Sequence, residues 1–271
     1  MYNLDDYFNI LNEFAPLSIS HKMIENGDYD NSGILVRCND KVKKVLYSLD
    51  LSKWAVEKAE EMGVDTIVTH HPAIYSPLKS LSILDSSSNA VLLAVKNNIN
   101  VISMHLNLDL ARRGIDHYLA IGLGAKEYKI IDYLNDENGY GREFCLNNSL
   151  NQIIENIKSN FETNKILVYG TESKTQSYLN DNGEKIIASF CGGGASHALE
   201  AVLENKTSAD IIITSDMPHH VIKELVENNK IVIIIPHYAS ENYGFKKFFN
   251  LINDKTKNKI ISEFFTDLRF L

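Results

Sequence analysis

The sequence predicts an α/β protein in which two related α/β layers surround mainly parallel or mixed sheets. The first observation is that short apolar, β-tolerant segments alternate with segments of helical periodicity, with short connections between them. The second is that this alternation restarts after a polar, glycine-containing stretch at residues 135–142. The third is a content of 44% hydrophobic and 23% charged residues, which excludes a disordered, collagen-like or coiled-coil chain.

The first layer is expected to begin with a strand and to continue in strand–helix order. Asp50 or Ser52 can cap the first helix, which runs through Met62 and stops at Gly63. In order, the expected elements are a strand at 43–49, the helix to residue 62, a strand at 64–69, a helix at 89–97, a strand at 100–104, a loop from residue 105 and a helix at 115–121.

The second layer repeats this pattern, and strand–helix–strand order implies parallel strands with helices on the faces of the sheet. The expected elements are a helix at 150–160, strands at 166–169 and 185–190, a helix at 196–204, a strand at 209–214, a helix at 218–228, a strand at 231–235, a loop at 237–241, a helix at 245–252 and a last short strand.

We expect two domains from a chain of 271 residues. Residues 1–124 plus 237–271 are predicted to form a metal-binding α/β domain, and residues 125–236 a second α/β domain. The junction is placed near residues 125–142, and the metal site is expected in the cleft between the domains.

Charge and composition exclude several classes of function. Twenty-seven Lys and Arg against 35 Asp and Glu give a net charge of −8, which disfavours nucleic-acid binding because phosphates attract positive surfaces. No apolar run approaches the roughly 20 residues of a membrane span. The first ten residues do not resemble a signal peptide. Cys38, Cys145 and Cys191 have no C-x-x-C spacing. They therefore fit reduced thiols of a cytoplasmic protein.

Histidines and carboxylates follow three separate expected strands. The three segments are His70-His71, then residues 105–109 (HLNLD), and residues 237–241 (HYASE). Ligands of open α/β sheets bind beyond the carboxyl ends of the strands, where the loops converge. A single histidine at a strand end is more often a hydrogen-bonded structural residue, but three such segments at equivalent ends favour a metal site.

The donor set indicates which metals could bind. Imidazoles and carboxylates without thiolate suit Zn, Fe, Mn or Co as divalent ions better than Cu(I) or an iron–sulfur cluster. Several imidazoles plus two carboxylates exceed the needs of one tetrahedral ion, so two metal ions per chain are plausible.

Two other segments carry weaker signals. The turn Gly192–Gly194, between an expected strand and helix, could present backbone N–H groups to an anion, or could simply be a tight turn that requires small residues. His219 and His220 open an expected helix and could support the metal ligands from behind, contact a substrate or be merely solvated.

The sequence resembles the Nif-three-like dinuclear metal-centre proteins, whose members commonly carry the name GTP cyclohydrolase 1 type 2 homologue. The resemblance rests on the run from Ser48 to Pro72, on the segments at 105–109 and 237–241, and on supporting motifs. Those motifs are Asp30-Asn-Ser-Gly33, Gly139-Tyr-Gly-Arg142, the Gly192–Gly194 turn and Ile213-Thr-Ser-Asp216.

The resemblance implies a ligand set. It places His71 and Asp109 on one metal and His70 and His237 on the other, with Glu241 bridging both. His105 matches a position before the metal-binding aspartate and is interpreted as a residue outside the ligand set. Two departures, Pro236 and Ser215 where the family usually has glycine, remove no ligand.

The resemblance also implies a function and an assembly. The expected function is that of a metal-dependent hydrolase resembling GTP cyclohydrolase 1 type 2, in which metal-activated water opens the GTP ring. Separately from the resemblance, we expect an imidazole such as that of His220 to transfer a proton. The alternative is a non-catalytic metal-binding or interaction protein in metal homeostasis. Expected partners are further copies of the chain, as a homohexamer, and a nucleotide or phosphorylated small molecule.

Overall fold

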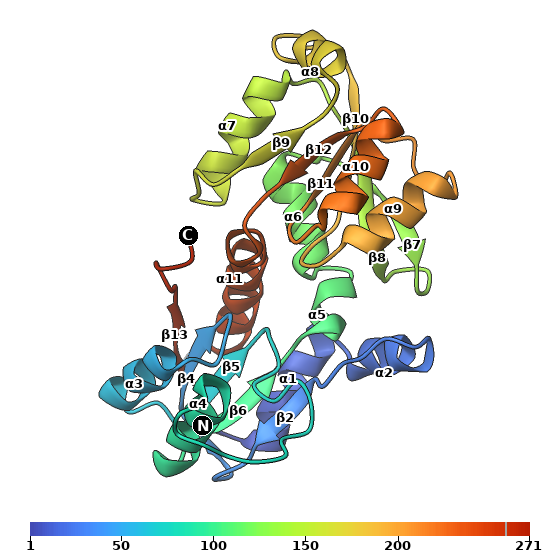
Figure 1. The fold of residues 1–271 in the computed structure, drawn as a ribbon. Helices are drawn as coiled ribbons and strands as arrows, with labels where there is room; N and C mark the ends of the chain where they lie inside the picture. Colours follow the sequence, from blue (N-terminus) through green and yellow to red (C-terminus); the bar gives the residue numbers. More distant parts are fainter. Residues whose placement is uncertain (258) are drawn as a thin grey trace. The chain divides into compact units, whose positions relative to one another are not determined.

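In the computed structural model, which describes residues 1–257 and 259–271, strand–helix pairs are organised into two units (Figure 1). Unit 1 consists of Met1–Ala111 and Phe245–Asp267, and unit 2 of Arg112–Gly244 and Leu268–Leu271. The α/β fold with mixed sheets is confirmed.

The sheet of unit 1 has the strand order β13-β4-β5-β6-β2. Neighbours from β13 to β6 are parallel, whereas β2 is antiparallel to β6. The elements of this unit are β1 (Tyr2–Asn3), α1 (Leu4–Phe14), α2 (Leu17–Glu25), β2 (Gly33–Val36), β3 (Lys41–Val42), β4 (Lys44–Ser48), α3 (Lys53–Met62), β5 (Thr66–Thr69), α4 (Ser86–Lys96), β6 (Asn100–Ser103), α5 (Leu106–Leu110) and β13 (Ile261–Phe265).

The register of unit 1 aligns the carboxyl ends of its three central strands. Ser48 pairs with Thr69, and Thr69 pairs with Ser103. The residues that follow these strands therefore emerge at one edge of the sheet.

The sheet of unit 2 has the strand order β7-β8-β10-β11-β12-β9. Only β10, β11 and β12 are mutually parallel, while β7, β8 and β9 pair antiparallel with their neighbours. The elements are α6 (Ile115–Leu123), β7 (Lys129–Tyr133), β8 (Gly139–Leu146), α7 (Leu150–Asn160), β9 (Leu167–Tyr169), α8 (Glu172–Tyr178), β10 (Lys185–Ser189), α9 (Ala195–Leu203), β11 (Ile211–Thr214), α10 (His219–Glu227) and β12 (Ile231–Ile234); α11 (His237–Thr256) begins here and continues into unit 1.

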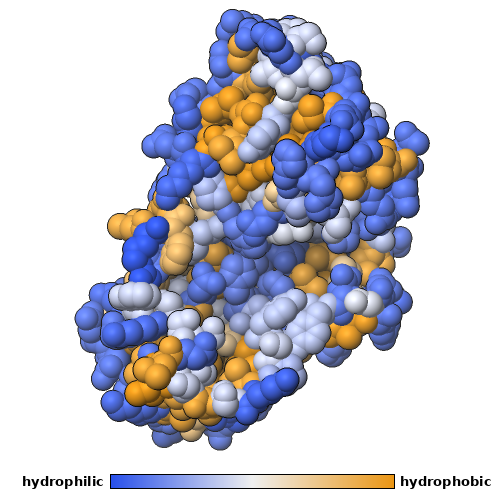
Figure 2. Space-filling view, in the orientation of Figure 1, coloured by the Kyte–Doolittle hydropathy of each residue, from blue (hydrophilic) through white to orange (hydrophobic). Residues whose placement is uncertain are grey.

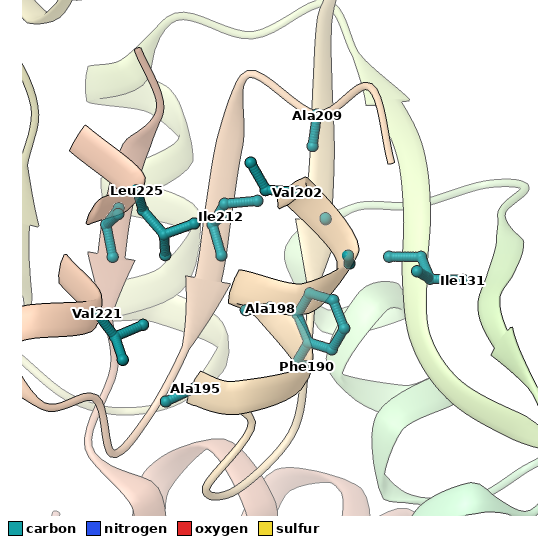
Figure 3. Packing of buried hydrophobic residues seen from close by; sticks show 12 residues of the cluster. Ile131, Phe190, Ala195, Ala198, Val202, Ala209, Ile212, Val221 and Leu225 are labelled. Carbon is teal, nitrogen blue, oxygen red and sulfur yellow. The ribbon is translucent and has the colours of Figure 1, made fainter. Parts of the chain in front are cut away.

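An apolar core lies between this sheet and helices α9 and α10 (Figure 3). Phe190 and Ile212 are fully buried, and Ala198 and Leu225 contribute from the two helices. Phe190 lies two residues before the glycine turn at 192–194, so the core holds the strand end from which that turn begins.

The structure corrects two sequence expectations. Residues 135–142, interpreted as a domain junction or exposed loop, form the connection of a β-hairpin and the first half of its second strand, because β7 and β8 pair antiparallel. Residues 237–241, expected as a loop, are the first turns of α11, whose Ser240 N–H donates to the carbonyl of Pro236 at 3.0 Å.

The unit boundaries lie after residues 111 and 244, whereas the sequence led us to expect them after 124 and 236. Helix α6 belongs with unit 2 because it packs against α7 and β8. Gly122 illustrates this packing, since a Cβ atom there would lie 2.7 Å from the Phe161 ring.

Among the described residues, no helix is both long enough and apolar enough to cross a membrane.

Apolar side chains gather over β9 and β12 (Figure 2). Leu167 of the edge strand β9 is 53% exposed there.

Candidate metal centre

In unit 1, an imidazole nitrogen of His70 lies close to a carboxylate oxygen of Asp109. His70 follows β5 and is completely buried, and its Nδ1 lies 2.8 Å from the carbonyl oxygen of Met104. Since a carbonyl can only accept, Nδ1 carries a proton, and Nε2 is the ring nitrogen able to offer a lone pair to a metal. That Nε2 lies 3.4 Å from Oδ1 of the buried Asp109.

His105 joins this group. It precedes the short helix α5, which carries Asp109, and ligand atoms of His70, His105 and Asp109 all lie within 4.8 Å of one another. Nδ1 of His105 lies 2.7 Å from Oδ1 of Asp30. The structure thus places His105 among the candidate ligands, where sequence reasoning had left it outside the set.

Asp30 is a buried carboxylate that orients His105. Burial alone would raise the pKa of Asp30, but hydrogen bonds from His105, Ser20 and Ser32 outweigh burial and hold this pKa below its usual value. The carboxylate is therefore ionised at neutral pH and accepts the Nδ1 proton of His105.

His71 lies beside His70, with their ring centroids 4.9 Å apart. Its Nδ1 lies 2.7 Å from Oδ1 of Asp50, which follows the neighbouring strand β4. Because the ends of β4 and β5 are aligned, the loop after each strand reaches the same edge of the sheet.

In unit 2, His237 and Glu241 stand one helical turn apart at the start of α11. Nδ1 of His237 lies 2.7 Å from Oδ2 of Asp216, and Nε2 lies 2.9 Å from Oε2 of Glu241. Glu241 is 2% exposed. Each unit therefore contains a histidine whose Nε2 faces a buried carboxylate oxygen.

All four histidines share one arrangement: Nδ1 lies 2.7–2.8 Å from an oxygen acceptor, so Nε2 is the ring nitrogen that would coordinate a metal. Metal-binding histidines almost always donate their second ring N–H in this way, which fixes the tautomer and the ring orientation. The oxygen acceptors are Asp30, Asp50, Asp216 and the carbonyl of Met104.

The distances also fit a metal. Two ligand atoms about 2.1 Å from one ion lie about 3.0 Å apart at a right angle and about 3.4 Å apart at the tetrahedral angle. The separations of 2.9 Å in unit 2 and 3.4 Å in unit 1 match these values.

Other predicted residues lie apart from these ligands. His220 is exposed on α10, where it lines a pocket of about 620 Å³ together with Asp216, Met217 and Ser196. His219 is also exposed.

Sequence reasoning missed the roles of Asp50 and Asp216. Asp50 was interpreted only as a helix cap, and Asp216 only as part of a supporting motif. Both follow strands, β4 and β11, and this was the same signal that identified the histidines.

Comparison with known sequences places the chain in one protein family. Residues 2–268 match the family described as Duf34/NIF3 (NGG1p interacting factor 3). A protein of Methanocaldococcus jannaschii named GTP cyclohydrolase 1 type 2 homolog is 30% identical over 260 residues, which are 95% of this chain and 97% of that protein. NGG1-interacting factor 3 of Saccharomyces cerevisiae is 27% identical over 282 residues, covering 96% and 94% of the two chains.

The fold has a similar counterpart among solved structures. The crystal structure of a hypothetical protein of Staphylococcus aureus superposes with a TM-score of 0.82 at 23% identity, covering 98% of this chain and 97% of that one. At this level of identity the likeness concerns the fold.

Proposed function

Because the chain belongs to the DUF34/NIF3 family, we propose that it binds two divalent metal ions and acts as a metal-dependent hydrolase. The proposed ligands are His70, His71, Asp109, His237 and Glu241. The first three belong to unit 1 and the last two to unit 2. His105 is a further candidate ligand.

The proposal rests on two places where an imidazole nitrogen lies close to a carboxylate oxygen. Nε2 of His70 faces Asp109, and Nε2 of His237 faces Glu241, while the Nδ1 proton of each ring is already engaged. A lone pair and a carboxylate repel each other at such distances unless a proton or a metal cation lies between them. Divalent cations bound among these ligand atoms would offset the repulsion, and the donor set suits Zn, Fe, Mn or Co.

The residues have distinct proposed roles. Two bound divalent ions would lower the pKa of a water molecule and polarise the bond under attack. Glu241 has two carboxylate oxygens and can bind one ion with each, whereas a neutral imidazole offers one nitrogen. His220 is proposed to transfer a proton, because its exposed imidazole shares the 620 Å³ pocket with Asp216, the partner of His237.

The name carried by several relatives makes GTP the first substrate to test, with hydrolytic opening of its purine ring. Other nucleotides and phosphorylated small molecules form the wider class. The alternative is a non-catalytic metal-binding or interaction protein, which the name of the yeast relative favours.

The test is the metal content per chain of wild type and of His70→Ala, Asp109→Asn and Glu241→Gln, purified identically, with the exposed His21→Ala as control. We expect two ions in wild type and in the control. His70→Ala and Asp109→Asn should each weaken mainly one site, and Glu241→Gln should weaken both.

Turnover is then measured on a panel of nucleotides and phosphoesters. Two ions without turnover of any compound would favour the alternative. Absence of bound metal from wild type, or retention of both ions by Glu241→Gln, would contradict the proposed metal centre or the bridging role respectively.

A further inference from the structure

Outside the candidate ligands, unit 2 contains a completely buried ion pair. Nη1 of Arg142, on β8, lies 2.8 Å from Oδ2 of Asp116, on α6, and both side chains have no exposed surface. The same guanidinium donates to the carbonyls of Gly139 and Gly141. Buried ion pairs contribute little net stability because both charges lose their hydration. Net stability therefore does not account for this pair, and the contact made by the other oxygen of Asp116 becomes important.

The second oxygen of Asp116 holds the glycine turn. Its Oδ1 accepts the backbone N–H of Cys191 at 3.1 Å. Two more side chains bind the same turn, since the Tyr140 hydroxyl donates to the Cys191 carbonyl and the Thr214 hydroxyl donates to the Gly192 carbonyl. Side chains from α6, β8 and β11 thus fix the backbone that joins β10 to α9.

The turn lies directly against Glu241. Gly192 has φ +57°, and a Cβ atom built there would lie 2.4 Å from Oε1 of Glu241 and 3.6 Å from Nε2 of His237. The backbone of Gly192 therefore packs closely against Oε1 of Glu241. The other carboxylate oxygen, Oε2, lies 2.9 Å from Nε2 of His237. A carboxylate confined in this way keeps one orientation before any metal arrives.

We propose that Asp116, anchored by Arg142, is a positioning residue for Glu241. It acts through the amide of Cys191, which holds the Gly192 turn against the carboxylate. The inference rests on the proposed function only in taking Glu241 as a metal ligand. It also explains why the turn contains glycine: the backbone must approach the carboxylate too closely for any side chain.

The test is a Co²⁺ titration of metal-free protein, followed by the visible absorption of Co²⁺ and by calorimetry. Gly192→Ala should weaken Co²⁺ binding about 10–100-fold, the loss typical when the surroundings of a ligand are disturbed, and should change the absorption spectrum. Gly193→Ala is the matched control, because a Cβ atom there meets nothing within 4 Å. It should bind Co²⁺ as wild type does.

Asp116→Asn tests the anchor. It should also weaken Co²⁺ binding and shift the spectrum. Glu143→Gln controls for simple loss of stability, because Glu143 lies next to Arg142 on β8 and binds Lys129, Thr207 and Ser208 rather than the turn. This control should lower the unfolding midpoint of the metal-free protein but leave the Co²⁺ spectrum unchanged.

The outcomes separate the two proposals. Wild type that binds no Co²⁺ would overturn the metal centre and the positioning role together. Wild type that binds Co²⁺, with Gly192→Ala indistinguishable from Gly193→Ala or Asp116→Asn indistinguishable from Glu143→Gln, would overturn the positioning role alone.

Discussion

The oxygen acceptors behind the histidines matter as much as the histidines themselves. A carboxylate on Nδ1 raises the basicity of the imidazole and holds the ring in place. Asp216 serves His237 in this way and is largely exposed, with 72% of its side chain accessible. It can therefore be replaced at little cost to folding.

We expect Asp216→Asn to lower the affinity for divalent metal about 10-fold, because the amide still accepts the hydrogen bond but has lost the charge. Chelator competition on the metal-loaded protein measures this. Glu61→Gln, an exposed substitution on α3, serves as control, and equal affinities of the two variants would refute the expectation.

His117 gives a prediction on pH. Burial lowers its pKa to about 4, and the charges of Arg142 and Arg113 act in the same direction. The neutral ring binds the Tyr128 hydroxyl at 2.7 Å. In the unfolded chain the histidine has a pKa near 6.5, so between pH 6.5 and 4 the unfolded state binds more protons than the folded state.

Stability should therefore fall as the pH drops through this window. Allowing for solvent screening of a half-buried ring, the loss due to His117 should be about 1–2 kcal/mol. Denaturant unfolding of wild type and His117→Gln at pH 7.5 and 4.5 measures the difference, with the exposed His21→Gln as control. The idea fails if His117→Gln loses as much stability on acidification as wild type.

At the scale of the element, helix α3 shows what sequence can determine. Ser52 accepts the N–H of Ala55, and Gly63 ends the helix with φ +63°, both as expected. Local signals of this kind act within a few residues and need no tertiary context.

Gly63→Ala should destabilise the protein by about 1 kcal/mol, because a Cβ atom at this φ is strained. It meets no neighbour within 4 Å, so strain is the whole effect. The measurement is thermal unfolding of Gly63→Ala and of Gly193→Ala, because the second substitution introduces neither a strained φ nor a close contact. The difference between the two midpoints gives the cost of the strain. Equal midpoints would show that the end of the helix tolerates alanine.

The expectation of a loop at 237–241 was wrong for a reason that concerns tertiary packing. Histidine, tyrosine and serine are weak helix formers, and this segment follows a strand and Pro236. Its helical conformation is stabilised by burial of Tyr238 and Ala239. Sequence patterns pointed to the candidate ligands because strand ends are recognisable. The same signal marks Asp50 and Asp216, but which histidine each carboxylate meets depends on the register of neighbouring strands, which the sequence does not show.

For the whole molecule, the expectation concerns assembly. The resemblance leads us to expect a homohexamer, and the edge strand β9, with exposed Leu167 and Tyr169, offers unpaired backbone and apolar surface to another copy. Light scattering at micromolar concentration should give a mass well above the 30.6 kDa of one chain.

Leu167→Lys should reduce that mass if β9 contributes to the contact, while Leu203→Lys, an equally exposed position on α9, should not. A monomeric wild type would refute the assembly. An unchanged oligomer in Leu167→Lys would place the contact elsewhere.

The division of unit 1 along the chain has a consequence for biosynthesis. Strand β13 pairs with β4, yet Arg112–Gly244, which contain every strand of the unit 2 sheet, come before the return of the chain to unit 1 at Phe245. At about 5–20 residues per second, a ribosome needs roughly 10–30 s to supply the missing strand. During that interval one side of β4 is unpaired, so the nascent first unit is a candidate client for chaperones, whereas the sheet of unit 2 is contiguous and can fold first.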